Sequence, residues 1–326
     1  MRALITGING FAGSHLADYL VARGGWDIWG LARKPVIRWD HLQDDIRLVC
    51  ADLTCAEDVS RVLQHVRPQV IFHLAGQAFV PLSFRQPAST ISNNVFGLLS
   101  LFLAIIEHGL DTRVLTVGSY EQYGLIQPED LPIDEQTPLR PCNPYGTSKI
   151  AQDMLALQYY FSHGIDVVRV RPFNHIGPRQ DVSFVAPAFA HQIAAIELGI
   201  QPPVLQVGDL RAQRDFTDVR DMVRAYYLAI ESGQSGDVYN IGSGHALSVQ
   251  TLLDHLLAAS QVKITVEPDP ERMRPINVPL VVCDASRLQQ HTGWSPAIPF
   301  AQTIHDILED WRLRTRMNLK AQEIPV

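Results

Sequence analysis

The sequence has few of the residues that build disulfides and metal centres. It contains four cysteines among 326 residues and no C-x-x-C pair, too few for a disulfide framework in a chain of this length. The twelve histidines include no H-E-x-x-H pattern and no set with the cysteines at zinc spacing. We therefore expect reduced thiols, a cytoplasmic location and no metal site.

The sequence also lacks an excess of positive charge and a long apolar run. Lysine and arginine number 27 against 34 acidic residues, whereas nucleic-acid-binding proteins carry a basic face. No uninterrupted apolar run reaches the ~18 residues that span a membrane. The start, MRALITGING, has no separate apolar segment followed by a cleavage site, as a secretory signal would. These absences predict a protein that binds neither nucleic acid nor a membrane.

Short apolar runs alternate with amphipathic stretches through the first half of the chain. Runs of five or six residues, spaced by roughly 15 to 35 residues, are typical of βαβ units around a buried parallel sheet. They are residues 2–6, 26–31, 46–50, 70–75, 113–117 and 166–171. Two intervening stretches carry helix signals: residues 11–24 end in glycine, and residues 55–66 begin beside acidic residues.

The rhythm loosens after RPFNHIGPRQ, where prolines become frequent and the expected strands shorter. We predict an α/β fold with a Rossmann-type, doubly wound parallel sheet in residues 1–173. A smaller α/β domain that binds the substrate is expected in residues 174–326. Part of residues 211–242 is expected to return to the first domain, so that the two domains are interleaved.

A glycine triplet follows the first expected strand. LITGINGFAG places Gly7, Gly10 and Gly13 between that strand and the first expected helix. Glycines allow a tight turn and let backbone N–H groups approach a pyrophosphate, while the helix N-terminus adds partial positive charge. Ordinary turns also use glycine, but the position between strand and helix favours a dinucleotide site.

The segment after the second strand indicates which dinucleotide to expect. An NAD site usually has an acidic residue there for the ribose 2′-hydroxyl, whereas this chain has Arg33 and Lys34. Their charges suit a 2′-phosphate, so NADP(H) is favoured. NAD(H) stays open, because two cations can also form an ordinary solvated loop. Asp52, which ends the third strand, is placed to accept a hydrogen bond from the adenine amino group.

A tyrosine and a lysine one helical turn apart suggest acid–base chemistry. Tyr145 and Lys149 lie at positions i and i+4 in NPYGTSKIAQ, and Pro144 suits the first turn of a helix. An ammonium one turn away is expected to lower the pKa of the phenol toward neutrality. The chain has nine tyrosines and only four lysines, so the pairing is informative.

Together these motifs resemble the extended short-chain dehydrogenase/reductases that act on nucleotide sugars. The resemblance runs almost end to end, through the glycine triplet, FHLAGQ, Ser119, the Tyr145–Lys149 pair and QRDFTDVRD. HLAGQAFVPLSF, RPFNHIGPRQ and RMRP are most similar to the GDP-4-keto-6-deoxy-D-mannose reductases, which form GDP-D-rhamnose. The resemblance implies that Ser119 binds the sugar carbonyl, that Tyr145 gives it a proton, and that Lys149 tunes the tyrosine and holds the cofactor. Hydride would come from NAD(P)H.

The resemblance also implies which residues line the two ligands. Besides the glycine triplet, Tyr145 and Lys149, the cofactor would contact Asn9, Phe11, Ala12, Arg33, Asp52, Leu53, Leu74, Ala75, Gly76, Asn94, Val117 and Pro172. Many relatives have alanine where this chain has Gly76. The GDP-linked 4-keto-6-deoxy sugar would contact Glu121, Asn174, Arg179, Val185, Arg214 and Arg274. Arginine forks suit its diphosphate.

Glu121 leaves a second reaction open. GDP-mannose 4,6-dehydratases carry a T-S-E motif at the positions of Ser119, Tyr120 and Glu121, where the glutamate can remove a sugar proton. Related reductases also have an acid there, and Ser119 and bulky Tyr120 replace the dehydratase threonine and serine. A reductase, with Glu121 among its catalytic residues, is therefore the favoured hypothesis. A GDP-mannose 4,6-dehydratase and a nucleotide-sugar 4-epimerase stay open, as does the configuration at C4 of the product.

Two expected helices carry more apolar surface than one face of a sheet could cover. They are residues 90–109 and 143–164. The resemblance implies a homodimer in which these helices from both subunits form a four-helix bundle.

Overall fold

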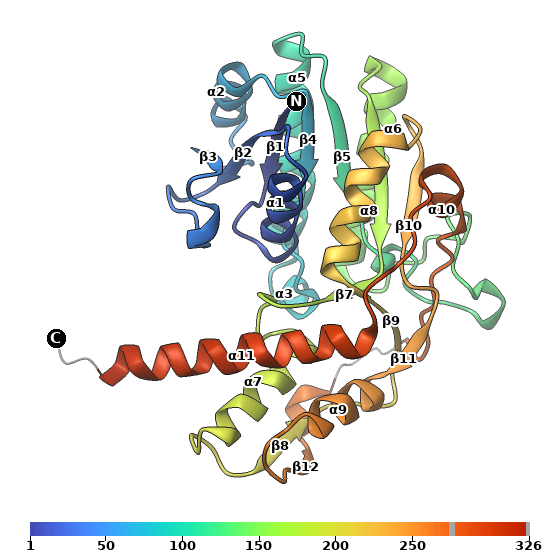
Figure 1. The fold of residues 1–326 in the computed structure, drawn as a ribbon. Coiled ribbons are helices and arrows are strands. Elements are labelled where there is room, and N and C mark those ends of the chain that lie inside the picture. Colours follow the sequence, from blue (N-terminus) through green and yellow to red (C-terminus); the bar gives the residue numbers. More distant parts are fainter. Residues whose placement is uncertain (274–277, 324–326) are drawn as a thin grey trace.

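The computed structural model describes residues 1–273 and 278–323, and the larger part of the chain surrounds one parallel sheet (Figure 1). The sheet has seven strands in the order β10-β6-β5-β4-β1-β2-β3. They are β1 (Arg2–Thr6), β2 (Asp27–Ala32), β3 (Ile46–Cys50), β4 (Val70–His73), β5 (Arg113–Val117), β6 (Val167–Pro172) and β10 (Val238–Ile241). The predicted Rossmann-type sheet is confirmed.

Helices cover both faces of this sheet. α1 (Phe11–Arg23), α8 (Val219–Ser232) and α10 (Ser286–Thr292) lie on one side. α2 (Ala56–Val66), α5 (Gly97–Glu107) and α6 (Pro144–His163) lie on the other. Ile5 and Phe72 belong to the core under α1 and α8, and their neighbours Leu4 and Ile71 to the core under α2 and α5. The strands are apolar throughout because both of their faces are buried.

The sequence predicts one helix over residues 90–109, but the structure has no single regular α-helix there. A π-helical turn (Ser92–Phe96) joins α4 (Pro87–Ile91) to α5, and it carries the fully buried Asn94. Short α3 (Val80–Arg85) precedes it. Residues Pro87–Glu107 are long and apolar enough to cross a membrane by length and composition alone. A core helix passes the same test, and half of this window is buried inside the protein.

The smaller part of the chain holds two short sheets and three helices. The first sheet has the order β11-β9-β7, with β7 (Asn174–Ile176), β9 (Gln213–Asp218) and β11 (Ala246–Ser248). The second pairs β8 (Val204–Val207) with β12 (Thr265–Pro268). α7 (Val185–Glu197), α9 (Val249–Ala258) and the long α11 (Phe300–Glu323) enclose a third core with them.

The chain passes between the two parts several times. After β9, α8 packs against β5 and β6, and β10 then pairs with β6 at the edge of the large sheet. Residues 219–241 thus contribute to the large sheet and its cover. A boundary at residue 173 stays a prediction.

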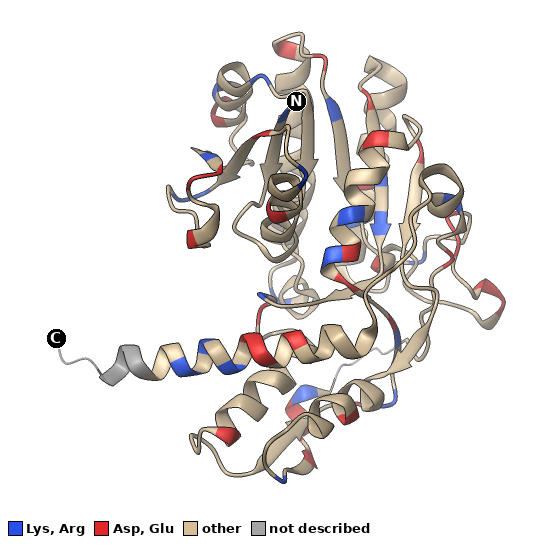
Figure 2. Ribbon diagram, in the orientation of Figure 1, with Lys and Arg blue, Asp and Glu red and all other residues tan. Residues whose placement is uncertain are grey.

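The last helix contacts the loop that follows β2. Trp39 in that loop lies beneath the guanidinium groups of Arg38 at 5.7 Å and of Arg314, on α11, at 5.9 Å. Arg314 also pairs with Asp310 one turn earlier, and Figure 2 shows both signs of charge along α11. α11 therefore links the smaller part of the chain to the loop where a 2′-phosphate is expected.

Candidate active site

The turn between β1 and α1 forms a cradle that suits a diphosphate. Gly7 has a φ of +74°, and a Cβ there would lie 2.9 Å from the backbone nitrogen of Ala75. A Cβ on Gly13 would collide with the carbonyl of Gly7. α1 starts after Gly10, which offers its first N–H groups no side-chain cap. Those groups are available to phosphate oxygens, so the turn fits the pyrophosphate of NAD(P).

Asn9 and Phe11 hold this turn against neighbouring segments. The Asn9 side-chain amide donates to the carbonyl of Val36 at 2.7 Å and accepts from the N–H of Arg38 at 2.9 Å. Phe11 stacks on His175, with the ring centroids 5.7 Å apart. Ala12, also expected at the cofactor, is the next residue of α1 and is partly buried.

The loop after β4 holds Leu74, Ala75 and Gly76, which are expected to contact the cofactor. This loop lies beside the turn between β1 and α1, next to Gly7. Asn94 supports this loop from behind: its Oδ1 accepts from the N–H of Gln77 at 2.8 Å, and its Nδ2 donates to Ser148 at 2.8 Å. Asn94 is fully buried and uses both amide groups in this way, so it positions the loop.

The predicted adenosine end is formed by the ends of β2 and β3, which are paired neighbours. Asp52 accepts hydrogen bonds from the hydroxyl and the N–H of Thr54, and these bonds, together with the charge of Arg33, hold the pKa of Asp52 below its usual value. Arg33 is close enough for its charge to act on Asp52. Its guanidinium is exposed, so it is accessible to a 2′-phosphate. Leu53 follows and packs toward Gly97.

Ser119, Tyr145 and Lys149 lie together where β5 ends and α6 begins. All three are buried, with 7%, 7% and 6% of their surface exposed. The Ser119 side chain lies close enough to Tyr145 to act on the pKa of its phenol. The Lys149 ammonium lies 6.0 Å from the centre of the Tyr145 ring and donates to the carbonyl of Val117 at 2.8 Å. Pro172, also expected at the cofactor, is buried at the end of the adjacent β6.

The pKa expected for Tyr145 is wrong. Burial raises the pKa of the phenol far above its usual value, and the neighbouring Ser119 side chain only partly opposes this. The lysine does not counter the effect, because burial also lowers the pKa of Lys149, to about 7. Tyr145 is therefore a protonated phenol at neutral pH, which is the form that can donate a proton to a carbonyl.

Glu121 is held by two hydrogen-bond donors beside this group. The Tyr120 hydroxyl donates to Oε1 at 3.0 Å, and the Asn143 amide donates to Oε2 at 2.8 Å. Asn143 also caps α6 by accepting from the N–H of Gly146 at 2.7 Å. Sequence reasoning missed Asn143, although an asparagine before proline at a helix start is an N-cap signal.

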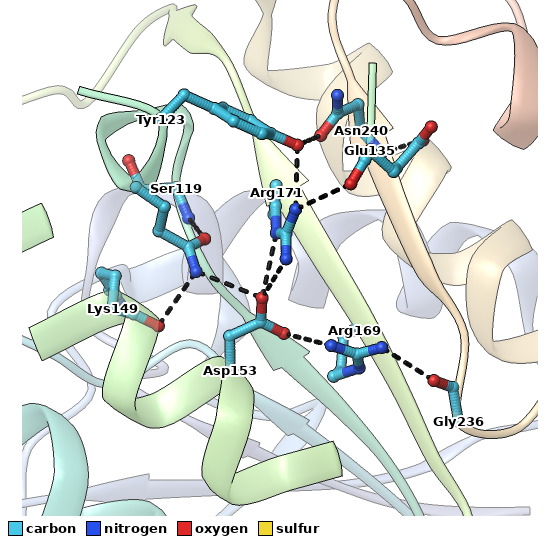
Figure 3. Close-up of polar contacts among 10 residues, drawn as sticks. Ser119, Tyr123, Glu135, Lys149, Asp153, Arg169, Arg171, Gly236 and Asn240 are labelled. Atoms are coloured by element: carbon cyan, nitrogen blue, oxygen red, sulfur yellow. Dashed lines mark hydrogen bonds and ion pairs between the residues drawn. The ribbon is translucent and has the colours of Figure 1, made fainter. Parts of the chain in front are cut away.

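A buried polar network behind the catalytic residues was also missed. Asp153, one turn beyond Lys149, accepts from Arg169 at 3.0 Å and from Arg171 at 2.6 Å (Figure 3). Gln122 connects this carboxylate to the catalytic loop, and Gln152 accepts from the Lys149 ammonium at 2.8 Å. Nothing in the sequence alone reveals these contacts, because each joins segments that are far apart or depends on side-chain direction.

Three of the residues predicted to bind the substrate lie in the smaller part of the chain. Asn174 lies in β7 opposite Phe216 of β9, and Val185 begins α7. Arg214 lies in β9, and its neighbour Asp215 binds the N–H groups of Ser243, Gly244 and Cys283. Asp215 thereby anchors the strand that carries Arg214.

Arg179 is engaged elsewhere. Its guanidinium pairs with Asp18 of α1 and lies 5.2 Å above the Trp39 ring, while its N–H donates to Asp310 at 2.9 Å. The structure therefore places Arg179 against α1 and the loop after β2. Arg274 lies outside the described residues. Within residues 1–273 and 278–319, no three histidine, cysteine, aspartate or glutamate side chains converge as metal ligands.

Comparison with known proteins decides the family. The profile of the GDP-mannose 4,6 dehydratase family matches residues 4–307. The chain belongs to this family. It is 38% identical to the GDP-6-deoxy-D-mannose reductase of Pseudomonas aeruginosa over 97% of this chain and 98% of that one. It is 30% identical to the GDP-mannose 4,6-dehydratase of Sinorhizobium fredii over 90% of this chain and 91% of that one.

A solved structure from this family has the same fold. The RMD of Pseudomonas aeruginosa, complexed with NADPH, superposes with a TM-score of 0.84 at 36% identity, covering 96% of this chain and 99% of that one. As a member of the GDP-mannose 4,6 dehydratase family, the chain is an enzyme of the extended short-chain dehydrogenase/reductase group.

Proposed function

We propose that the protein uses NADPH to reduce the 4-keto group of GDP-4-keto-6-deoxy-D-mannose, forming GDP-D-rhamnose. The buried grouping of Ser119, Tyr145 and Lys149, in which burial keeps the Tyr145 phenol protonated, is the observation that carries the proposal. The higher identity to a GDP-6-deoxy-D-mannose reductase than to the dehydratase supports the reductase reaction over the alternative.

The nicotinamide, when bound, supplies the hydride to C4 of the sugar. Ser119 donates a hydrogen bond to the sugar carbonyl, and Tyr145 transfers its phenolic proton to the same oxygen as negative charge develops. Two donors fixed before the reaction stabilise this charge without reorganisation. Lys149 lies beside them, and the carbonyl of Val117 accepts a hydrogen bond from its Nζ at 2.8 Å. Arg214 and Asn174 are assigned to the nucleotide sugar.

The activity is tested by following nicotinamide absorbance with the purified protein and NADPH. Offered GDP-4-keto-6-deoxy-mannose, the protein should oxidise one NADPH per sugar, and proton coupling constants of the product should show the rhamno configuration. GDP-mannose alone should cause no oxidation. Formation of a keto sugar from GDP-mannose without net NADPH consumption would instead establish a dehydratase, with Glu121 as its base.

Tyr145→Phe tests the role of the phenol. This change removes the hydroxyl proposed to protonate the carbonyl and should lower kcat about 100-fold to 10,000-fold. The dissociation constant for NADPH should change little. A Tyr145→Phe variant with wild-type kcat would refute the assignment.

The preference for NADPH is assigned to Arg33. Loss of one charge-assisted hydrogen bond to a 2′-phosphate should raise the KM for NADPH about tenfold in Arg33→Ala, because such a bond is worth about 1.5 kcal/mol. The KM for NADH should be unchanged. An equal effect on both cofactors would exclude this role.

A homodimer is proposed through α5 and α6. Leu103 and Ile106 on α5 and Met154 and Phe161 on α6 are exposed, and Phe161 exposes 75% of its surface. Such apolar side chains on adjacent helices suit a four-helix bundle with a second copy. Sedimentation at micromolar concentration should give a dimer, and Phe161→Glu should shift it to monomer. A monomeric wild type would refute the proposal. A cytoplasmic location stays a prediction.

A further inference from the structure

A buried glutamine connects the two segments that carry the catalytic residues. Gln122 is fully buried in the turn after β5. Its Oε1 accepts from the N–H of Ser119 at 3.0 Å, and its Nε2 donates to the carbonyl of Lys149 at 3.2 Å. One side chain thus contacts the backbone of both segments that carry the proposed catalytic residues.

The space around Gln122 is closely fitted. A Cβ on Gly118 would lie only 2.5 Å from its Oε1. An apolar side chain of similar length could fill this space, but it would leave the Ser119 N–H without its acceptor. Burial of an unpaired donor is costly, so the loop would have to move to satisfy it.

Asp153 fixes which way the amide points. Gln122 Nε2 donates to Asp153 Oδ2 at 3.2 Å, and Arg171 holds that same oxygen from β6 with Nε at 2.9 Å and Nη2 at 2.6 Å. A carboxylate only accepts hydrogen bonds, as does the Lys149 carbonyl. If the Gln122 amide were flipped, its oxygen would face two acceptors, the Asp153 carboxylate and the Lys149 carbonyl. Its NH₂ would then face another donor, the N–H of Ser119. The sheet therefore determines the position of Oε1 through Asp153.

Gln122 holds the backbone of Ser119, whose hydroxyl is proposed to bind the sugar carbonyl during proton transfer. Ser119 adopts an extended backbone, accepts from the N–H of Glu121 at 3.2 Å, and lies beside Tyr145. Small displacements of Ser119 would change the angle at which its hydroxyl meets the sugar carbonyl and the phenol. Displacements of this size cost large factors in rate.

We propose that Gln122 is a positioning residue that sets the Ser119 hydroxyl relative to Tyr145 and Lys149, using the Asp153–Arg171 pair as its anchor. The inference rests on the proposed roles of Ser119 and Tyr145. Gln122 touches neither substrate nor cofactor in this account. It acts only through the backbone of the catalytic segments.

The test compares Gln122→Met with a matched control, Gln192→Met. Gln192 is also a buried glutamine, on α7, with hydrogen bonds to the backbone of Ala188 and Gln206. Both variants should lose stability to urea. Gln122→Met should lower kcat for the keto sugar about tenfold to 100-fold with a less than twofold change in the dissociation constant for NADPH. Gln192→Met should keep kcat within twofold.

A double-mutant cycle separates positioning from a general structural effect. If Gln122 acts through Ser119, Gln122→Met should change kcat less than twofold when Ser119 is already alanine. A full additional loss in the Ser119→Ala background, or a wild-type kcat in Gln122→Met, would overturn the inference. If Gln122→Met does not fold, Gln122→Glu, which keeps the shape but loses the donor, replaces it in the same cycle.

The proposed function can fail separately from this inference. A wild-type protein that does not oxidise NADPH with the keto sugar refutes the function. A wild type that turns over and a Gln122 variant that turns over equally well refute the positioning role alone.

Discussion

Two kinds of buried cation contact α6 one helical turn apart. Lys149 donates to two neutral acceptors, the carbonyl of Val117 and the amide of Gln152. Arg169 and Arg171, on β6, share the carboxylate of Asp153, with 7% and 5% of their side chains exposed. Lys149 and Asp153 are one helical turn apart, so the same helix serves both groups.

The surroundings give the two groups opposite properties. Burial lowers the pKa of Lys149 to about 7, so its charge can change near neutral pH. Burial acts to lower the pKa of Arg171, but the charge of Asp153, the neighbouring Tyr123 and the hydrogen bonds to both together outweigh it, so the net pKa is raised. A buried cation among neutral dipoles is suited to chemistry, whereas a buried cation paired with an anion holds structure.

The largest effect should follow from breaking the paired group. Asp153→Asn leaves two buried guanidinium groups without their counter-ion and should lower the free energy of unfolding by about 3–5 kcal/mol. Urea unfolding measures this change. The control is Asp166→Asn, whose partly exposed ion pair with Arg113 should be worth less than about 1 kcal/mol. Equal losses in the two variants would contradict the distinction.

Lys149 should make stability depend on pH. Its pKa is about 7 in the folded protein against an ordinary 10.5, so between these values the unfolded chain holds a proton that the folded protein has released. The free energy of unfolding should therefore rise with pH, by about 1 kcal/mol per unit from this group. Urea unfolding at pH 7, 8 and 9 should show that Lys149→Met lacks this contribution.

The matched variant for this measurement is Lys263→Met. Lys263 is exposed, so its removal should leave the pH dependence of the wild type unchanged. If the free energy of unfolding rises equally with pH in the wild type and in Lys149→Met, Lys149 does not titrate between pH 7 and 9.

The smallest effect concerns the neutral surroundings of Lys149. A Cβ on Gly76 would lie 2.9 Å from Asn94 Oδ1 and 3.6 Å from the Lys149 ammonium nitrogen. Gly76→Ala should therefore displace the Asn94 amide and cost about 1 kcal/mol of stability, while leaving the charge of the lysine buried. Urea unfolding and the pH dependence of stability measure the two effects. A stability equal to wild type would show that Asn94 moves freely.

The large sheet could be predicted because its signals are local. The six apolar runs, the closing Gly24 of α1 and the acidic first turn of α2 each act within one segment. The proposed catalytic residues Ser119, Tyr145 and Lys149 came from motif and resemblance, and the structure brings them together.

What escaped prediction depends on tertiary contacts. The π-helical turn exists where Asn94 reaches Gln77 and Ser148, and the strands β7 and β11 are only three residues long. The direction of the Tyr145 pKa shift follows from burial of the ring, which no helical spacing reveals. Ser119 and Gln122 have the S-x-x-Q spacing of a capping box, which the structure shows, but the contacts that join Gln122 and Asp153 to each other and to β6 follow only from the tertiary fold.

The packing of α11 on the loop after β2 makes Trp39 a natural optical probe. Its indole lies among the guanidinium groups of Arg38, Arg179 and Arg314, which come from three separate segments of the chain. Any opening between the large sheet and α11 would remove Arg314 from the ring and admit water to it. The emission of a variant that keeps only this tryptophan would therefore report any separation of α11 from the loop after β2 in real time, without an attached dye.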